Sequence, residues 1–391
     1  MTTYLHRRGG DGRPRVAVLA PRWSARGEGG WALRQVAGSL ALSADVHVLT
    51  PQGASARGTF DGPFTVQELA SAPPAAVTAR RAVLLDALST GHANESASPD
   101  DVDALLDEGQ EQWEAAAAHL RAVHPDLVVV GDATQTGALR LARSVCPGVP
   151  VVLVPLAASG DRLEHRALRP VFDAAAVALV FTDAEADAVR AVAPGLAVRH
   201  VGLPLAANDS VRREPNTFTA DLRYVLAVTD VPWEAAAWPN TAVALLRPGV
   251  EGTAVAIAAS DRFVLCHEGE ERQTSAVERG SDMLRLIAWA AAVVDVRPGR
   301  LYGRRTLDAL LYGTPVVAPA DSRAREHVAR GGLWFDGPGD LRWCVEALGD
   351  ERTRRRLGDQ GRRYAEERYC GLEAFSSRVA DAVTPALAVA G

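Results

Sequence analysis

Short apolar runs with the length of buried strands alternate with segments of helical periodicity along most of this chain. Residues 15–20 (RVAVLA) have the pattern of a buried strand, residues 31–42 place apolar side chains at helical spacing, and residues 45–50 form a second strand pattern. A strand, a helix and a strand in this order make a βαβ unit, and such units build parallel sheets with helices on both faces. The chain is therefore predicted to be an α/β protein.

The same alternation continues in two series separated by a polar stretch. In the first series the pattern predicts further strands at 126–131, 151–154, 177–182 and 198–202, and helices at 77–88, 98–123, 136–145, 168–176 and around Glu185. Residues 208–219 are polar, contain a proline and are predicted to be a linker. A second series follows, with strands at 224–228, 263–266, 292–296 and 315–318 and mostly helical sequence after residue 340.

Length and composition agree with two domains and exclude several classes of protein. The chain has 391 residues, and domains have about 100–200 residues each. No apolar run approaches the roughly 20 residues of a membrane helix, and no apolar signal segment follows the N-terminus, so a cytoplasmic location is expected. The four cysteines are scattered, which indicates neither a zinc ribbon nor a disulfide framework. A net charge of −6 argues against a nucleic-acid partner.

The chain contains no lysine, so all 42 basic residues other than histidine are arginines. A Schiff-base lysine and a P-loop lysine are therefore both excluded. Any anion bound by this protein must be held by arginine, histidine or backbone amides.

A glycine-rich loop precedes the first predicted helix. Its pattern, Gly27-x-Gly29-Gly30, is not the dinucleotide fingerprint, which requires GxGxxG tight against the strand, so an NAD-dependent enzyme is disfavoured. Small residues ahead of a helix N-terminus let backbone amides approach an anion closely. The alternative is an ordinary βα loop.

Residues 300–317 (RLYGRRTLDALLYGTPVV) are the most informative segment for function. They predict a loop, a helix that starts near Gly303, a tight turn and a buried strand. Free amides at the helix start and three arginines nearby would suit a diphosphate. Asp308, about one turn inside the helix, could accept hydrogen bonds from a ribose. The alternative is a helix start with solvated arginines.

This segment resembles the donor-binding signature of retaining family-four GT-B glycosyltransferases, in which a loop Pro-Ser-x-x-Glu-Gly-Phe-Gly precedes a helix ending Glu-Ala-x-x-x-Gly-x-Pro-Val-Val. Other segments resemble the family in the same order, namely Gly29-Gly30, residues 125–129 (PDLVV), 181–185 (FTDAE), 326–335 (EHVARGGLWF) and 357–362 (LGDQGR). The resemblance implies the GT-B fold, with two Rossmann-like parallel-sheet domains facing a cleft. It implies an N-terminal acceptor domain at 1–207, a C-terminal donor domain at 216–360, and C-terminal helices at 361–391 that pack back towards the first domain.

The chain also departs from the family pattern. Arg300 and Asp308 stand where the family has two glutamates, of which the first contacts the donor sugar. The basic pair expected near residue 228 is missing, and so is a histidine expected near residue 155. We expect Arg300 to supply the missing positive charge.

Two functions remain open on this basis. The first is transfer of a sugar from a nucleotide-diphosphate donor to an unknown acceptor (a glycan, a lipid or a small molecule), retaining, metal-independent and without a cofactor. The second is a catalytically silent GT-B protein that acts as a partner or regulator of an active glycosyltransferase. A peripheral membrane contact and a protein partner are left open, and no catalytic residue is assigned. The predicted donor-binding residues are Gly29, Gly30, Arg300, Gly303, Arg304, Thr306 and Asp308.

Overall fold

The computed structural model describes residues 12–21, 23, 28–51, 63–69, 111–133, 135–156, 169–205, 211, 219, 222–228, 254–258, 262–267, 270–275, 281–295, 303–320, 325–369 and 371–389. The predicted helix at 77–88, the first part of the predicted helix at 98–123, most of the predicted linker and Arg300 lie outside these residues. The chain divides into two compact units, one of residues 1–204 and 371–391 and the other of residues 205–370.

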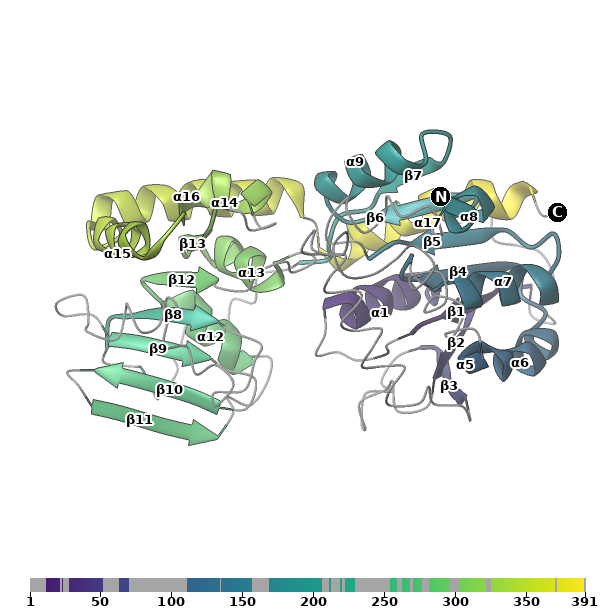
Figure 1. Cartoon of the computed structure of the whole chain (residues 1–391), viewed down its shortest axis with the longest axis horizontal. Coiled ribbons are helices and arrows are strands. Elements are labelled where there is room, and N and C mark those ends of the chain that lie inside the picture. Colours follow the sequence, from purple (N-terminus) through teal and green to yellow (C-terminus); the bar gives the residue numbers. More distant parts are fainter. Residues whose placement is uncertain are drawn as a thin grey trace, which may run out of the picture. The chain divides into compact units, whose positions relative to one another are not determined.

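The first unit is built on a seven-stranded sheet in which every neighbouring pair is parallel (Figure 1). The spatial order is β3-β2-β1-β4-β5-β6-β7, so the chain starts in the middle of the sheet and reverses direction between β1 and β4. The strands are β1 (Arg15–Leu19), β2 (Asp45–Pro51), β3 (Thr65–Leu69), β4 (Leu127–Gly131), β5 (Val151–Val154), β6 (Val177–Val180) and β7 (Ala197–His200).

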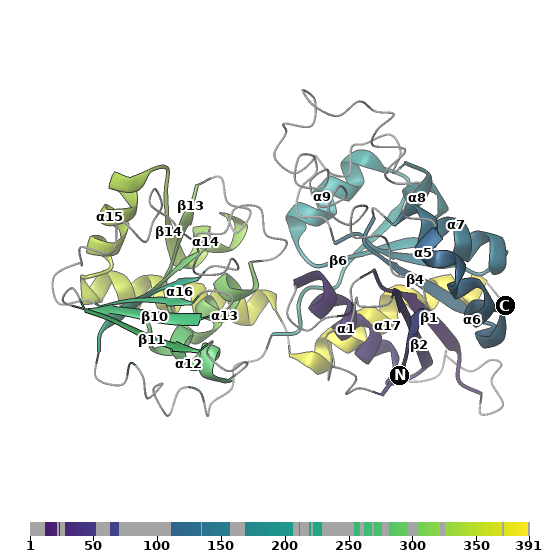
Figure 2. The same cartoon turned by 60° about the horizontal axis from the view of Figure 1, so that its bottom comes forward.

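Helices cover both faces of this sheet, as the apolar character of its strands requires. The strand side chains on one face form a core cluster with side chains from five helices. These are α5 (Glu111–Glu114), α6 (Ala116–Val123), α7 (Thr136–Val145), α8 (Arg169–Ala174) and α9 (Asp183–Val192). On the other face α1 (Glu28–Leu40) packs against β2, and α17 (Leu372–Val389) packs against α1, β5 and β6 (Figure 2). The last helix of the chain is thus part of the first unit.

The second unit also has a seven-stranded sheet, in the order β11-β10-β9-β8-β12-β13-β14. Its strands are β8 (Tyr224–Val228), β9 (Ala254–Ala258), β10 (Arg262–His267), β11 (Glu270–Ser275), β12 (Ala292–Asp295), β13 (Val316–Pro319) and β14 (Gly332–Phe335). Its helices are α12 (Ser281–Trp289), α13 (Arg304–Tyr312), α14 (Arg325–Gly331), α15 (Pro338–Ala347) and α16 (Glu351–Arg368).

The prediction of an α/β protein with Rossmann-like parallel sheets is confirmed, with one difference in the second sheet. There β9, β10 and β11 pair antiparallel at one edge. The edge strand β11 has the sequence EERQTS, which carries no apolar alternation and therefore gave no strand signal. In the sheet β11 pairs on one side only, with β10, and a polar sequence is common at such an edge.

Candidate functional site

Helix α13 follows β12 in the second unit and begins where the sequence predicted. Its N-cap, Gly303, has φ 58° and ψ 46°, which is the left-handed region. Glycine adopts this conformation without the penalty that a Cβ atom brings. The first turn of α13 therefore starts immediately after a sharp bend that only this residue type makes without strain.

A buried hydrogen bond ties the first turn of α13 to the end of β12. The hydroxyl of Thr306 donates to Oδ2 of Asp295 at 2.9 Å, and both residues are buried. Asp295 is the last residue of β12, and ligands of open α/β sheets bind beyond the carboxyl ends of the strands. The pair therefore fixes the helix start at the edge of the sheet where a ligand is expected.

Asp295 was missed by the sequence reasoning. The only signal for it was a carboxylate that ends the apolar run AVVD. A buried acidic residue at such a place needs a partner, and Thr306 provides one.

Replacing Thr306 by valine should destabilise the second unit by about 1.5–3 kcal/mol, because the buried carboxylate of Asp295 loses a hydrogen-bond donor. Urea unfolding of the full chain measures this loss. Thr306→Ser keeps the hydroxyl and is expected to retain most of the stability. Equal stability of the serine and valine variants would contradict the structural role of this hydrogen bond.

Asp308 lies beside two arginines of its own helix. Its Oδ2 is 3.9 Å from Nε of Arg304 and 3.6 Å from Nη1 of Arg305. The side chain of Asp308 is 7% exposed, whereas the two arginines are about one-third exposed (30% and 29%). The spacings are i,i+4 and i,i+3, the ones at which helical side chains meet. Asp308 therefore holds both guanidinium groups near the helix start.

The charges described at this edge of the second sheet balance. Arg304 and Arg305 pair with Asp308, and the second carboxylate, Asp295 at the end of β12, accepts a hydrogen bond from Thr306. The positive potential offered to an anion here then depends on the backbone amides of the first turn of α13. Arg300, which was predicted to add charge, lies outside the described residues.

Gly29 and Gly30 belong to the first unit, where they form part of the first turn of α1. Gly30 is buried and Gly29 is half-buried. This helix follows β1, so its start also lies at the carboxyl edge of its sheet. The two predicted groups of site residues thus lie in different units, each at the same kind of position.

Two residues with positive φ mark the carboxyl edge of the first sheet. Asp132 (φ 74°) follows β4, and Leu156 (φ 52°) follows β5 by two residues. Neither is glycine, and such conformations cost about 1–3 kcal/mol each and cluster at binding and catalytic sites. Sequence reasoning missed both. Leucine does not favour this conformation, and aspartate adopts it more often than most residues but is not a specific signal for it.

Among the described residues, no three His, Cys, Asp or Glu side chains gather closely enough to hold a metal ion. No described helix has both the length and the apolar character needed to cross a membrane.

Comparison with known proteins gives matches of structure only. No protein-family model matches the chain, and no curated protein matches its sequence. Sucrose-phosphate synthase from Thermosynechococcus elongatus is 13% identical, with a TM-score of 0.61 over 94% of this chain and 98% of that one. HepE from Anabaena, solved in complex with UDP-glucose, is 14% identical, with a TM-score of 0.63 over 95% of this chain and 100% of that one.

A third similar structure carries a different description. A UDP-N-acetylglucosamine 2-epimerase from Listeria monocytogenes, described as putative, is 13% identical, with a TM-score of 0.58 over 95% of this chain and 96% of that one. At such identities the likeness concerns the fold. It extends over nearly the whole of each chain and includes both α/β units, and this chain therefore has the GT-B fold.

Proposed function

We propose that this protein is a glycosyltransferase that takes a sugar from a nucleotide-diphosphate donor, with retention at the anomeric carbon and without a bound metal. The observation that carries the proposal is the start of α13. There Gly303 bends the chain, Thr306 is hydrogen-bonded to Asp295, and two arginines are held by Asp308. HepE, which has a similar fold, was solved with UDP-glucose.

In this proposal the second unit binds the donor. Amides of the first turn of α13 face the diphosphate, and Arg304 and Arg305 add charge-assisted hydrogen bonds. Negative charge grows on the diphosphate as the bond to the sugar breaks, so groups that stabilise it there lower the barrier. Because the described side-chain charges balance, we assign the excess positive charge to Arg300. The acceptor, which is a glycan, a lipid or a small molecule, is assigned to the first unit.

Arg300→Ala should weaken binding of nucleoside diphosphates by about ten- to a hundredfold, which corresponds to the loss of one charge-assisted contact. Calorimetry of the full chain with UDP, GDP, ADP and dTDP measures this. Arg342→Ala is the matched control, because Arg342 lies on α15 of the same unit and pairs with Glu346 at the surface. The control is expected to bind as the unchanged protein does.

Asp308→Asn separates two roles of that residue. If Asp308 accepts hydrogen bonds from the ribose, the variant binds the free nucleoside more weakly than the unchanged protein. If it only holds Arg304 and Arg305, nucleoside binding is unchanged and diphosphate binding tightens, because a competing carboxylate has lost its charge.

A donor that binds is then tested for chemistry. Release of the nucleoside diphosphate together with a glycosylated acceptor supports the transferase, whereas an epimerised nucleotide sugar assigns the chain to another reaction on the same fold. No binding of any common nucleotide or nucleotide sugar at millimolar concentration would contradict the proposal. The silent partner of an active glycosyltransferase would then replace it.

A further inference from the structure

Asp132 comes directly after β4, at the place where the strand order of the first sheet reverses. From the neighbouring strands β1 and β4 the sheet is built outwards in two directions, through β2 to β3 on one side and through β5 to β7 on the other. Ligands of open α/β sheets bind beyond the carboxyl ends of the strands at such a reversal. Asp132 therefore lies at the position where a sheet of this kind is expected to bind a ligand.

The residues around Asp132 are packed, whereas Asp132 itself reaches solvent. Among the described residues from 127 to 139, all are buried except Asp132, which is half-buried. Gly131, just before it, lies so close under the side chain of Leu33 in α1 that a Cβ atom there would overlap the leucine. The end of β4 thus presents one partly exposed side chain in a packed surrounding, and that side chain is a carboxylate.

Hydrogen bonds hold the backbone of Asp132 in the left-handed region, with φ 74°. Its N–H donates to the carbonyl of Val154 at 2.8 Å, and its own carbonyl accepts from the N–H of Gln135 at 3.1 Å. The next N–H, that of Ala133, donates to the carbonyl of Pro155 at 3.0 Å, so the two chains stay paired beyond the ends of β4 and β5. A side chain on a backbone fixed in this way is preorganised for a ligand.

Two other non-glycine residues among those described have a positive φ, and one of them has an ordinary explanation. His124 (φ 49°) is the C-cap of α6, where the left-handed conformation is common. Leu156 (φ 52°) lies beyond β5, the strand next to β4. The two positions that no helix cap explains therefore follow neighbouring strands at one edge of the sheet, and such positions cluster at binding and catalytic sites.

We propose that Asp132 binds neighbouring hydroxyl groups of a neutral sugar or polyol, which is the acceptor of the proposed transferase. An ionised carboxylate only accepts hydrogen bonds, and its two oxygens can take both hydroxyls of a diol. Repulsion between like charges disfavours an acceptor that carries a phosphate or a carboxylate at this position. The inference rests on the proposed function for the role of this ligand, because the acceptor is assigned there to the first unit.

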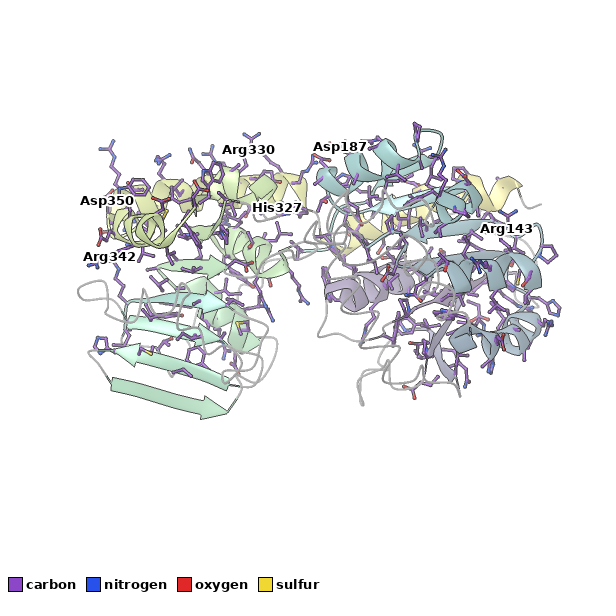
Figure 3. The ribbon with its side chains drawn as sticks, viewed as in Figure 1. Arg143, Asp187, His327, Arg330, Arg342 and Asp350 are labelled. Carbon is purple, nitrogen blue, oxygen red and sulfur yellow. The ribbon has the colours of Figure 1, made fainter. Side chains whose placement is uncertain are left out.

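Calorimetry of the full chain with glucose, mannose and myo-inositol, each with and without UDP, is the first experiment. Asp132→Asn keeps the size of the side chain and should weaken binding of the sugar or polyol by about tenfold, because the hydroxyls lose a charged acceptor. Asp187→Asn removes the same charge from an exposed position on α9 of the same unit and should leave binding unchanged (Figure 3). Glucose 6-phosphate should bind no more tightly than glucose.

Urea unfolding separates a role in binding from a role in the fold. Asp132→Gly removes the carboxylate together with the strain of a side chain at positive φ, so without ligand it should unfold at the same urea concentration as the unchanged protein or at a higher one. Its binding of the sugar or polyol should fall as in Asp132→Asn. His124→Gly relieves the same kind of strain before the other end of β4 and should leave binding unchanged.

The outcomes distinguish a failure of this inference from a failure of the proposed function. If none of UDP, GDP, ADP and dTDP binds, the proposed transferase fails, whatever the sugars do. If a nucleotide binds and no neutral sugar or polyol of the panel binds at millimolar concentration, the role of Asp132 alone is overturned. It is also overturned if Asp132→Asn binds the sugar or polyol as the unchanged protein does, if glucose 6-phosphate binds more tightly than glucose, or if Asp132→Gly lowers the stability.

Discussion

Replacing Gly358 by alanine is expected to lower the free energy of unfolding of the second unit by about 3 kcal/mol, because the added methyl group meets backbone and not a side chain that can turn away. A Cβ atom at Gly358 in α16 would overlap the carbonyl oxygen of Gly313. Gly313 is the C-cap of α13 and has φ 76°, so its position is fixed by the end of that helix. Urea unfolding of the full chain, followed by circular dichroism, measures the loss.

Two other glycines rank the effect. At Gly361, also in α16, a Cβ atom would meet the end of the Leu310 side chain and lie 3.0 Å from the Cα atom of Gly331. The side chain can move and the backbone contact is less close than the overlap at Gly358, so Gly361→Ala should cost less than Gly358→Ala. Gly339 lies in the first turn of α15 with open space around it, and Gly339→Ala should leave stability unchanged or raise it by up to about 1 kcal/mol. The reverse order of the three variants would contradict the close approach of α13 and α16.

This approach matters for the proposed donor site, because α16 packs on α13 at the end opposite to Gly303. The glycines at 358 and 361 were visible in the sequence as part of a segment resembling family-four glycosyltransferases. Their physical reason was not visible there. A helix-helix contact this close is made by residues from two distant segments, and no local pattern reports it.

The fold class could be predicted because the central strands are apolar throughout. Strands such as β1, β4 and β12 are buried on both faces of a sheet and appear as continuous apolar runs. Four strands were not predicted. Strands β3, β11 and β14 lie at sheet edges, whereas β9 (AVAIA) is a buried strand inside the second sheet. The sequences of β3 and β11, TVQEL and EERQTS, are partly or wholly polar, and polar residues are common in strands at a sheet edge.

The candidate site could be predicted only in part, for a related reason. Gly303 and the arginines next to it were found because glycine before a helix and positive charge beside it are local signals. The ion pairs of Arg304 and Arg305 with Asp308 could have been expected from their spacing. The hydrogen bond of Thr306 with Asp295 could not, because it joins separate elements of the fold.

Acid is expected to destabilise the second unit through His327, by about 3 kcal/mol between pH 6.5 and pH 4. His327 lies on α14 and is buried, whereas Arg330 of the same helix points outward (Figure 3). Burial lowers the pKa of His327 from 6.5 to about 4. In the unfolded chain the imidazole takes up a proton as the pH falls below 6.5, while in the folded unit it stays neutral until about pH 4. The unfolded state therefore binds more protons in this range, and stability falls as the pH falls.

His327→Gln tests this expectation, since glutamine does not titrate and its amide can still meet the tyrosine hydroxyls. In the folded unit Nδ1 of His327 lies 2.9 Å from the hydroxyl of Tyr369 and 3.3 Å from that of Tyr364. Urea unfolding at several pH values should show a shallower loss of stability in this variant than in the unchanged protein. His119→Gln, which leaves His327 in place, should keep the steep loss. If both variants lose stability with acid as steeply as the unchanged protein does, His327 is not the source of the acid sensitivity. The His327→Gln variant removes only the proton uptake by this imidazole in the unfolded chain, so an unchanged loss must come from another group.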